Sequence, residues 1–135
     1  MGQQQLLLIV LAMILIGAAI LVGMQIYDES NREAAIDVMS KDLMDLAGQA
    51  MNYYRTPTSL GGGGQSFMSG SGGWEVPNSF EILDNRKYSV STISSNSLEI
   101  LGQSLNNETG KDNIEGVKVF LQINNNSITD MRIEN

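Results

Sequence analysis

The side chains that usually carry out catalysis are sparse in this sequence. It contains no His and no Cys, so the commonest general base, the commonest metal ligand and the thiol nucleophile are all missing. Asp28, Glu29 and Glu33 share one stretch, which we interpret as the solvated face of a helix. Asp112 and Glu115 are close in sequence, but a Ca²⁺ site needs more oxygen ligands at defined spacing. We therefore expect no catalytic residues, no cofactor, no metal site and no enzymatic activity.

A glycine-rich run lies in the middle of the chain, and such runs can cradle phosphate groups. A phosphate-binding loop needs Lys and then Ser or Thr after the glycines, and Gln65-Ser66 stands there instead. We interpret residues 56–79 as a loop that connects a helix to a sheet. The alternative is a loop packed between neighbouring subunits, anchored by Phe67, Met68 and Trp74.

Charge is divided unequally along the 135 residues. The 15 acidic and 8 basic side chains give a net charge of -7, and the first charged residue is Asp28. An acidic balance argues against nucleic acid as a partner, because phosphates attract Lys and Arg. Two tripeptides match the acceptor for N-glycosylation, at Asn107 and at Asn125, and their use is left open.

The segment from Leu6 to Met24 contains no polar side chain. As a helix it spans about 28 Å, close to the thickness of the hydrocarbon core of a bilayer. A helix that is apolar on all sides must be covered by lipid or by other helices. A signal peptide would need basic residues within residues 1–5, and a single-span anchor usually has basic flanks. A self-assembling helix in the core of a filament explains the missing flanking charges.

The helical pattern continues past the apolar segment but becomes amphipathic. Apolar residues recur at intervals of three and four, which predicts one buried helix face. Polar residues, Asp42 among them, occupy the other face. We predict one helix from the N-terminus to Arg55, since Thr56 precedes a proline. The apolar face packs on the C-terminal part of the chain or, alternatively, forms a coiled coil; its residues are Ile36, Met39, Leu43, Leu46, Ala50 and Tyr53.

The remaining residues alternate between apolar and polar, as strands with one buried face do. We predict four antiparallel strands, near residues 87–93, 97–101, 117–123 and 128–133, with a loop over residues 105–112. The fold class is therefore α+β, with a long N-terminal helix packed on a small C-terminal antiparallel sheet. The predicted parts are residues 1–27 (apolar helix), 28–55 (amphipathic helix), 56–79 (connecting loop) and 80–135 (β-rich head).

This architecture resembles that of a mature type IV pilin, in the superfamily that includes pseudopilins and archaeal pilins. The specific match is short, and consists of residues 1–5 followed at once by the apolar run from Leu6. The resemblance implies a structural subunit of an extracellular filament on the cell surface, with roles in adhesion or motility. It implies a membrane-bound precursor, other copies of the chain as partners, a prepilin peptidase and a pilus assembly machinery.

The resemblance also assigns roles to residues of the helix. Met1 corresponds to the first mature residue, which is often N-methylated; cleavage after Gly2, or Met1 as the initiator, are the alternatives. Gln5 stands where bacterial members have a Glu that pairs with the N-terminal amine of a neighbour, and its carbonyl can accept a hydrogen bond. The helix lacks the proline of many members, so Gly17 and Gly23 are its weak points. The residues expected to pack in the filament core are Leu6, Leu7, Leu8, Ile9, Val10, Leu11, Ile14, Leu15, Ile20 and Leu21.

Overall fold

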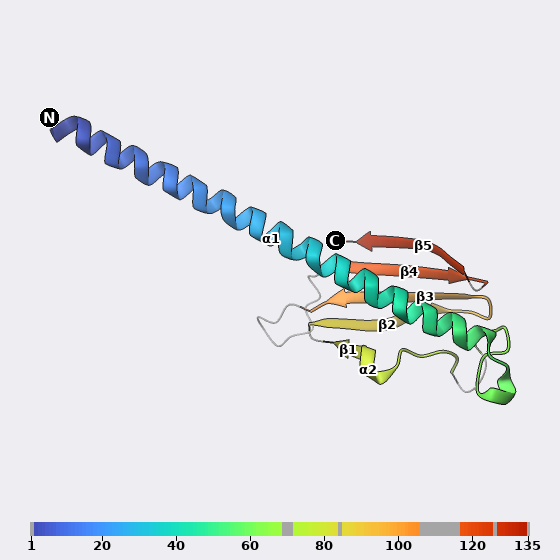
Figure 1. Cartoon of the computed structure of the whole chain (residues 1–135). Coiled ribbons are helices and arrows are strands. Elements are labelled where there is room, and N and C mark those ends of the chain that lie inside the picture. Colours follow the sequence, from blue (N-terminus) through green and yellow to red (C-terminus); the bar gives the residue numbers. More distant parts are fainter. Residues whose placement is uncertain (1, 69–71, 84, 106–116, 126, 135) are drawn as a thin grey trace. The chain divides into compact units, whose positions relative to one another are not determined.

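The computed structural model describes residues 2–68, 72–83, 85–105, 117–125 and 127–134 (Figure 1). The first helix, α1, runs without a break from Gly2 to Arg55. A 3₁₀ turn, η1 (Thr58–Leu60), and a short helix, α2 (Asn78–Glu81), follow it. The strands are β1 (Ile82–Leu83), β2 (Arg86–Ile93), β3 (Ser97–Ser104), β4 (Lys118–Asn124) and β5 (Ser127–Glu134). The predicted α+β class is confirmed.

The chain divides into two compact units, residues 1–34 and residues 35–135. The division falls inside α1, seven residues after the first charged side chain. We call residues 35–135 the head, because they contain the last part of α1 and the whole sheet. The predicted boundary between the apolar helix (residues 1–27) and the amphipathic helix (residues 28–55) is based on composition and stays a prediction.

The five strands form one sheet in the order β1-β2-β3-β4-β5, with every neighbouring pair antiparallel. The sequence predicted four strands, and the fifth is β1. It pairs only Ile82 with Lys87 and Leu83 with Arg86. Two residues are too few for an alternating pattern, which explains why the sequence analysis missed this strand.

The core of the head lies between α1 and one face of the sheet, across which the helix runs in Figure 1. Alternate residues of β3 and β4 are buried, as expected for strands with one covered face. Apolar side chains of α1 meet them from the other side. The buried residues are Met39, Leu43, Leu46, Ala47 and Ala50 from α1, with Phe67, Trp74, Tyr88, Leu98, Ile100, Val117, Val119, Leu121 and Ile123.

The glycine-rich run closes the C-terminal end of α1. The backbone N–H of Gly63 donates to the carbonyl of Tyr53 at 2.8 Å, and Gln65 donates to Tyr54 at 2.8 Å. These bonds satisfy carbonyls that a helix end leaves without an intrahelical partner. A Cβ on Gly63 would overlap the carbonyl of Ser66 and lie 2.8 Å from the ring of Tyr53, so only glycine fits. Residues 63–65 therefore cap the helix and are not part of a free linker.

Two of the three proposed loop anchors belong to the head itself. Phe67 is fully buried, and its ring centroid lies 4.8 Å from that of Tyr54 on α1. Trp74 is 7% exposed, in the same core, whereas Met68 is 54% exposed. The alternative in which Phe67 and Trp74 contact a neighbouring subunit is therefore wrong, because their own chain already covers them.

Candidate assembly surface

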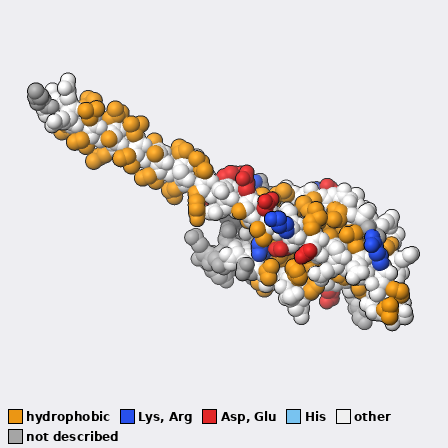
Figure 2. Space-filling view, viewed as in Figure 1, with side chains coloured by type: hydrophobic (Ala, Val, Ile, Leu, Met, Phe, Trp, Pro, Cys, Tyr) orange, Lys and Arg blue, Asp and Glu red, His pale blue; other side chains and the backbone are white. Residues whose placement is uncertain are grey.

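The first unit exposes an apolar helix surface that the chain itself does not cover. Every residue from 2 to 34 is exposed. Among the large apolar side chains up to Met24, the exposed fraction runs from 48% at Val10 to 68% at Met13. Figure 2 shows hydrophobic side chains along this length of the helix. Such a surface in water marks a site for lipid or for another protein.

The same helix meets the requirements for crossing a membrane by its length and composition. It contains an 18-residue window with a mean hydropathy of 3.1, and none of that window is buried. About 20 apolar residues are needed to span the hydrocarbon core. An exposed helix of this kind suggests membrane association or packing within a filament.

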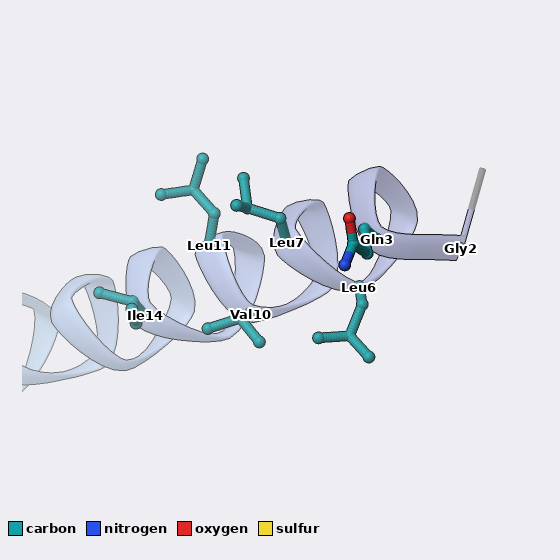
Figure 3. A pocket seen from close by; sticks show the side chains of 7 residues that line it. All are labelled: Gly2, Gln3, Leu6, Leu7, Val10, Leu11 and Ile14. Atoms are coloured by element: carbon teal, nitrogen blue, oxygen red, sulfur yellow. The ribbon is translucent and has the colours of Figure 1, made fainter.

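One face of α1 near its start forms a shallow hollow (Figure 3). Its lining residues are adjacent pairs that recur every four positions, followed by Ile14, so they lie along one side of a single helix. The hollow is a groove between side chains that stays open to its surroundings, and it suits a facing helix better than a small molecule. Its lining residues are Gly2, Gln3, Leu6, Leu7, Val10, Leu11 and Ile14.

The residues expected in the filament core all lie in this exposed part of α1, from Leu6 to Leu21. Gln5 is exposed one residue before them, and Met1 lies outside the described residues. The helix continues through Gly17 and Gly23, as predicted for a chain without proline there. A Cβ at either glycine would meet nothing within 4 Å. The chain's own packing therefore does not require glycine at these positions.

The amphipathic stripe of α1 lies against the sheet of its own chain. Met39, Leu43, Leu46 and Ala50 are fully buried there. Ile36 and Tyr53, at the two ends of the stripe, are partly buried against the same core. The stripe is thus occupied within the chain and is not free for the alternative coiled coil.

A polar contact between α1 and β2 was not expected from the sequence. The hydroxyl of Tyr88 donates a hydrogen bond of 2.6 Å to Oδ2 of Asp42. Nε of Arg86 lies 3.8 Å from the same oxygen. Asp42 was assigned to the solvated face of the helix, and this assignment is wrong: it lies at the edge of the stripe, where its carboxylate reaches the sheet. Its spacing, three residues after Met39 and four before Leu46, was the available signal, because residues three and four apart are neighbours on a helix.

Burial raises the pKa of Tyr88 far above its ordinary value of 10.0, and the hydrogen bond to Asp42 adds to this shift. Above pH 10 the unfolded chain releases the tyrosine proton while the folded head retains it. Stability contributed by Tyr88 is therefore complete below pH 10 and falls as the pH rises above it.

We expect Tyr88→Phe to lower the stability of the head by roughly 1–3 kcal/mol at pH 8, because it removes a bond to a charged group. Above pH 10 the free energy of unfolding of the wild-type chain should fall more steeply than that of the variant, by up to about 1.4 kcal/mol per pH unit. Urea unfolding at pH 8, 10 and 11, followed by the fluorescence of the single Trp, measures both effects. Equal pH slopes for the two chains would contradict the assignment.

The residues considered for metal binding or glycosylation are not part of the apolar surface of α1. Within the described residues, no three acidic side chains are grouped so that they could hold a metal ion. Asp112, Glu115 and the acceptor Asn107 lie outside the described residues, as does all of the expected loop over 105–112 except Leu105. Asn125 lies at the exposed turn between β4 and β5, with a positive φ of 45°.

Taken together, a long apolar N-terminal helix and a small antiparallel sheet packed on the second half of that helix form a pilin-like architecture. No protein-family model, curated protein or solved structure matches the chain.

Proposed function

We propose that this chain is a structural subunit of a type IV pilus-like extracellular filament, as a divergent member of the type IV pilin superfamily. The observation that carries the proposal is the apolar surface of α1, which is exposed on every side while the head already has its own core. Because the head already has a core of its own, the apolar helix is the part of the chain that most requires partners. Other copies of the same helix supply a matching surface.

The proposed mechanism is the packing of apolar helices into a filament core with the acidic heads outside. Burying one Leu or Ile side chain from water stabilises by about 1.5–3 kcal/mol. A subunit that starts in lipid gains less, because lipid already covers its helix, and close van der Waals packing then drives association. Gly17 and Gly23 favour such close approach, and the side-chain carbonyl of Gln5 can accept a hydrogen bond from the N-terminal amine of a neighbour.

On this proposal the partners are further copies of the chain, a prepilin peptidase and the assembly machinery in the cytoplasmic membrane. The precursor resides in that membrane. The assembled filament lies at the cell surface, where it acts in adhesion or motility. We propose a structural rather than an enzymatic role, which the absence of His and Cys supports. The net charge of -7 supports a partner set without nucleic acid.

Negative-stain imaging of cells with and without this chain tests the proposal. We expect filaments that disappear on deletion of the chain and also on deletion of the prepilin peptidase. Intact-mass measurement of the filament subunit should give a mature end at Met1 with one added methyl group, and a mass beginning at Gln3 would move the processing site. A chain recovered only as a detergent-extracted monomer, from cells without filaments, would contradict the proposal.

The second candidate is a single-span membrane-anchored binding domain that does not polymerise. The hydropathy and length of the α1 window favour it, since both suit one bilayer crossing. The same imaging experiment separates the candidates, because an anchored domain leaves no filaments and stays with the membrane.

A further inference from the structure

The last strand, β5, forms an open edge of the sheet (Figure 1). It runs from Ser127 to Glu134, and seven of its eight residues are exposed. The opposite edge strand, β1, has only two residues. Proteins usually protect an edge with a short strand, proline, lysine or a bulge. β5 carries charged side chains at Asp130, Arg132 and Glu134, which also protect an edge. It has a shift of register where Ile128 and Asp130 meet β4, so its pairing is regular from Asp130 onward.

The side chains along this regular part alternate in chemistry and in the face they occupy. Met131 pairs with the buried Leu121 and so lies on the core face, where it is partly buried. Asp130 pairs with the neutral Gln122 and lies on the opposite face, as does Arg132, which pairs with Phe120. Arg132 lies 5.5 Å from the centroid of the Phe120 ring and 3.7 Å from Glu99. Its side chain is still 57% exposed.

These residues make the edge complementary to itself. In an antiparallel pair related by a two-fold axis, a residue on the axis meets its own copy, and the residues on either side of it exchange partners. An axis at Met131 places Asp130 of each strand directly opposite Arg132 of the other. Opposite charges in such directly facing positions stabilise a strand pair.

We propose that β5 binds β5 of a second copy of this chain, antiparallel and centred on Met131. The pair joins two sheets through their backbones, with two Asp130–Arg132 contacts on the outer face and two Met131 side chains on the core face. The exposed Ile133 and Ile128 of each copy lie beside this seam.

The contact is independent of the proposed filament. The two-fold axis of an antiparallel strand pair is perpendicular to the sheet, so it reverses a helix that packs along the face of the sheet, as the last part of α1 does. The β5 pair therefore cannot lie inside a filament whose helices all run the same way. It joins copies that belong to two different filaments, or two copies outside a filament. A chain that polymerises without the β5 pair therefore contradicts only this inference, and a β5 pair without filaments contradicts only the proposed function.

The absence of Cys from the sequence permits a direct test. Met131→Cys in the full-length chain, held in detergent micelles, places two thiols across the axis. Directly opposed residues of an antiparallel pair have Cα atoms about 4.5–5.5 Å apart, which suits a disulfide. We expect mild oxidation to give a covalent dimer at least tenfold faster than in Thr92→Cys, a matched control on the exposed part of β2. Equal rates for the two variants overturn the proposal.

Charge variants in the Met131→Cys background test the pairing chemistry. Asp130→Lys and Arg132→Asp should each reduce the disulfide yield at least fivefold, since each places like charges opposite one another. An equimolar mixture of the two variants should regain the yield as a mixed dimer, in which both contacts are restored with opposite charges. Because a fold defect in either chain cannot be repaired by mixing, a mixture that stays monomeric overturns the proposal. Single variants that dimerise as well as their parent also overturn it.

Discussion

Ile14→Lys is expected to abolish filament formation without unfolding the head. Ile14 lies in the middle of the apolar part of α1, is 63% exposed and belongs to the hollow face shown in Figure 3. A lysine at the centre of a membrane helix costs roughly 2.5–3.5 kcal/mol of insertion free energy. An unpaired charge in a protein interior costs several kcal/mol of desolvation free energy. In a helical polymer every subunit carries the same defect, so the loss recurs at each addition step. Imaging of shed filaments and their yield by mass measure the effect.

The matched controls separate charge from side-chain shape. Ile14→Leu keeps an apolar residue of similar volume and should form filaments in normal amounts. Leu8→Asp places the opposite charge six residues away on the same helix and should fail as Ile14→Lys does. The emission and near-UV signal of Trp74 should match wild type in all three variants, because Trp74 lies in the core of the head. Filaments from Ile14→Lys in wild-type amounts would show that this helix is not in the filament core.

The main elements were predictable because local pattern and tertiary packing agree in them. The apolar run from Leu6, the stripe that ends at Tyr53 and the proline at position 57 predicted the length of α1. The alternation around Leu121 predicted β4 and its buried face. In each case the residue period of the element also fixes which side chains are buried, so one pattern gave both.

The parts that sequence reasoning missed depend on contacts between distant residues. Sequence reasoning assigned Asp42 to the solvated face of the helix, because its partner Tyr88 is 46 positions away in the chain. Phe67 and Trp74 stand among glycines and serines without any period, and their burial follows from the way the loop returns over the end of α1. The two-residue β1 exists because β2 offers it an edge. Apart from the spacing of Asp42 from Met39 and Leu46, none of these features has a local signature.

The candidate surface was predictable for a different reason. A helix without polar side chains from Leu6 to Met24 has one physical requirement, which is an apolar surround. The structure supplies none from within the chain, since residues 2–34 are all exposed. The sequence could not show whether the amphipathic half of the helix also needs a second chain to cover its apolar face. Its stripe is buried on the sheet of the same chain, so this stripe, unlike the first part of the helix, needs no partner.

Leu43→Ala should strongly destabilise the head, and Met44→Ala should be nearly silent. Leu43 is fully buried at the centre of the stripe, whereas the adjacent Met44 is 49% exposed. Removing a buried leucine costs about 2–5 kcal/mol through lost burial and the remaining cavity. An exposed position usually changes stability by less than about 0.5 kcal/mol. The pair therefore compares burial at two neighbouring positions of one helix.

Thermal unfolding of the full-length chain in detergent, followed by Trp74 fluorescence, measures the difference. For a head of this size we expect the Tm of Leu43→Ala to fall by more than about 8 °C. The Tm of Met44→Ala should stay within about 3 °C of wild type. Filament yield should follow the same order, since a head with an opened core leaves α1 without its support. Equal losses in the two variants would show that this half of α1 is covered on both sides, and the sheet would then not be its main partner.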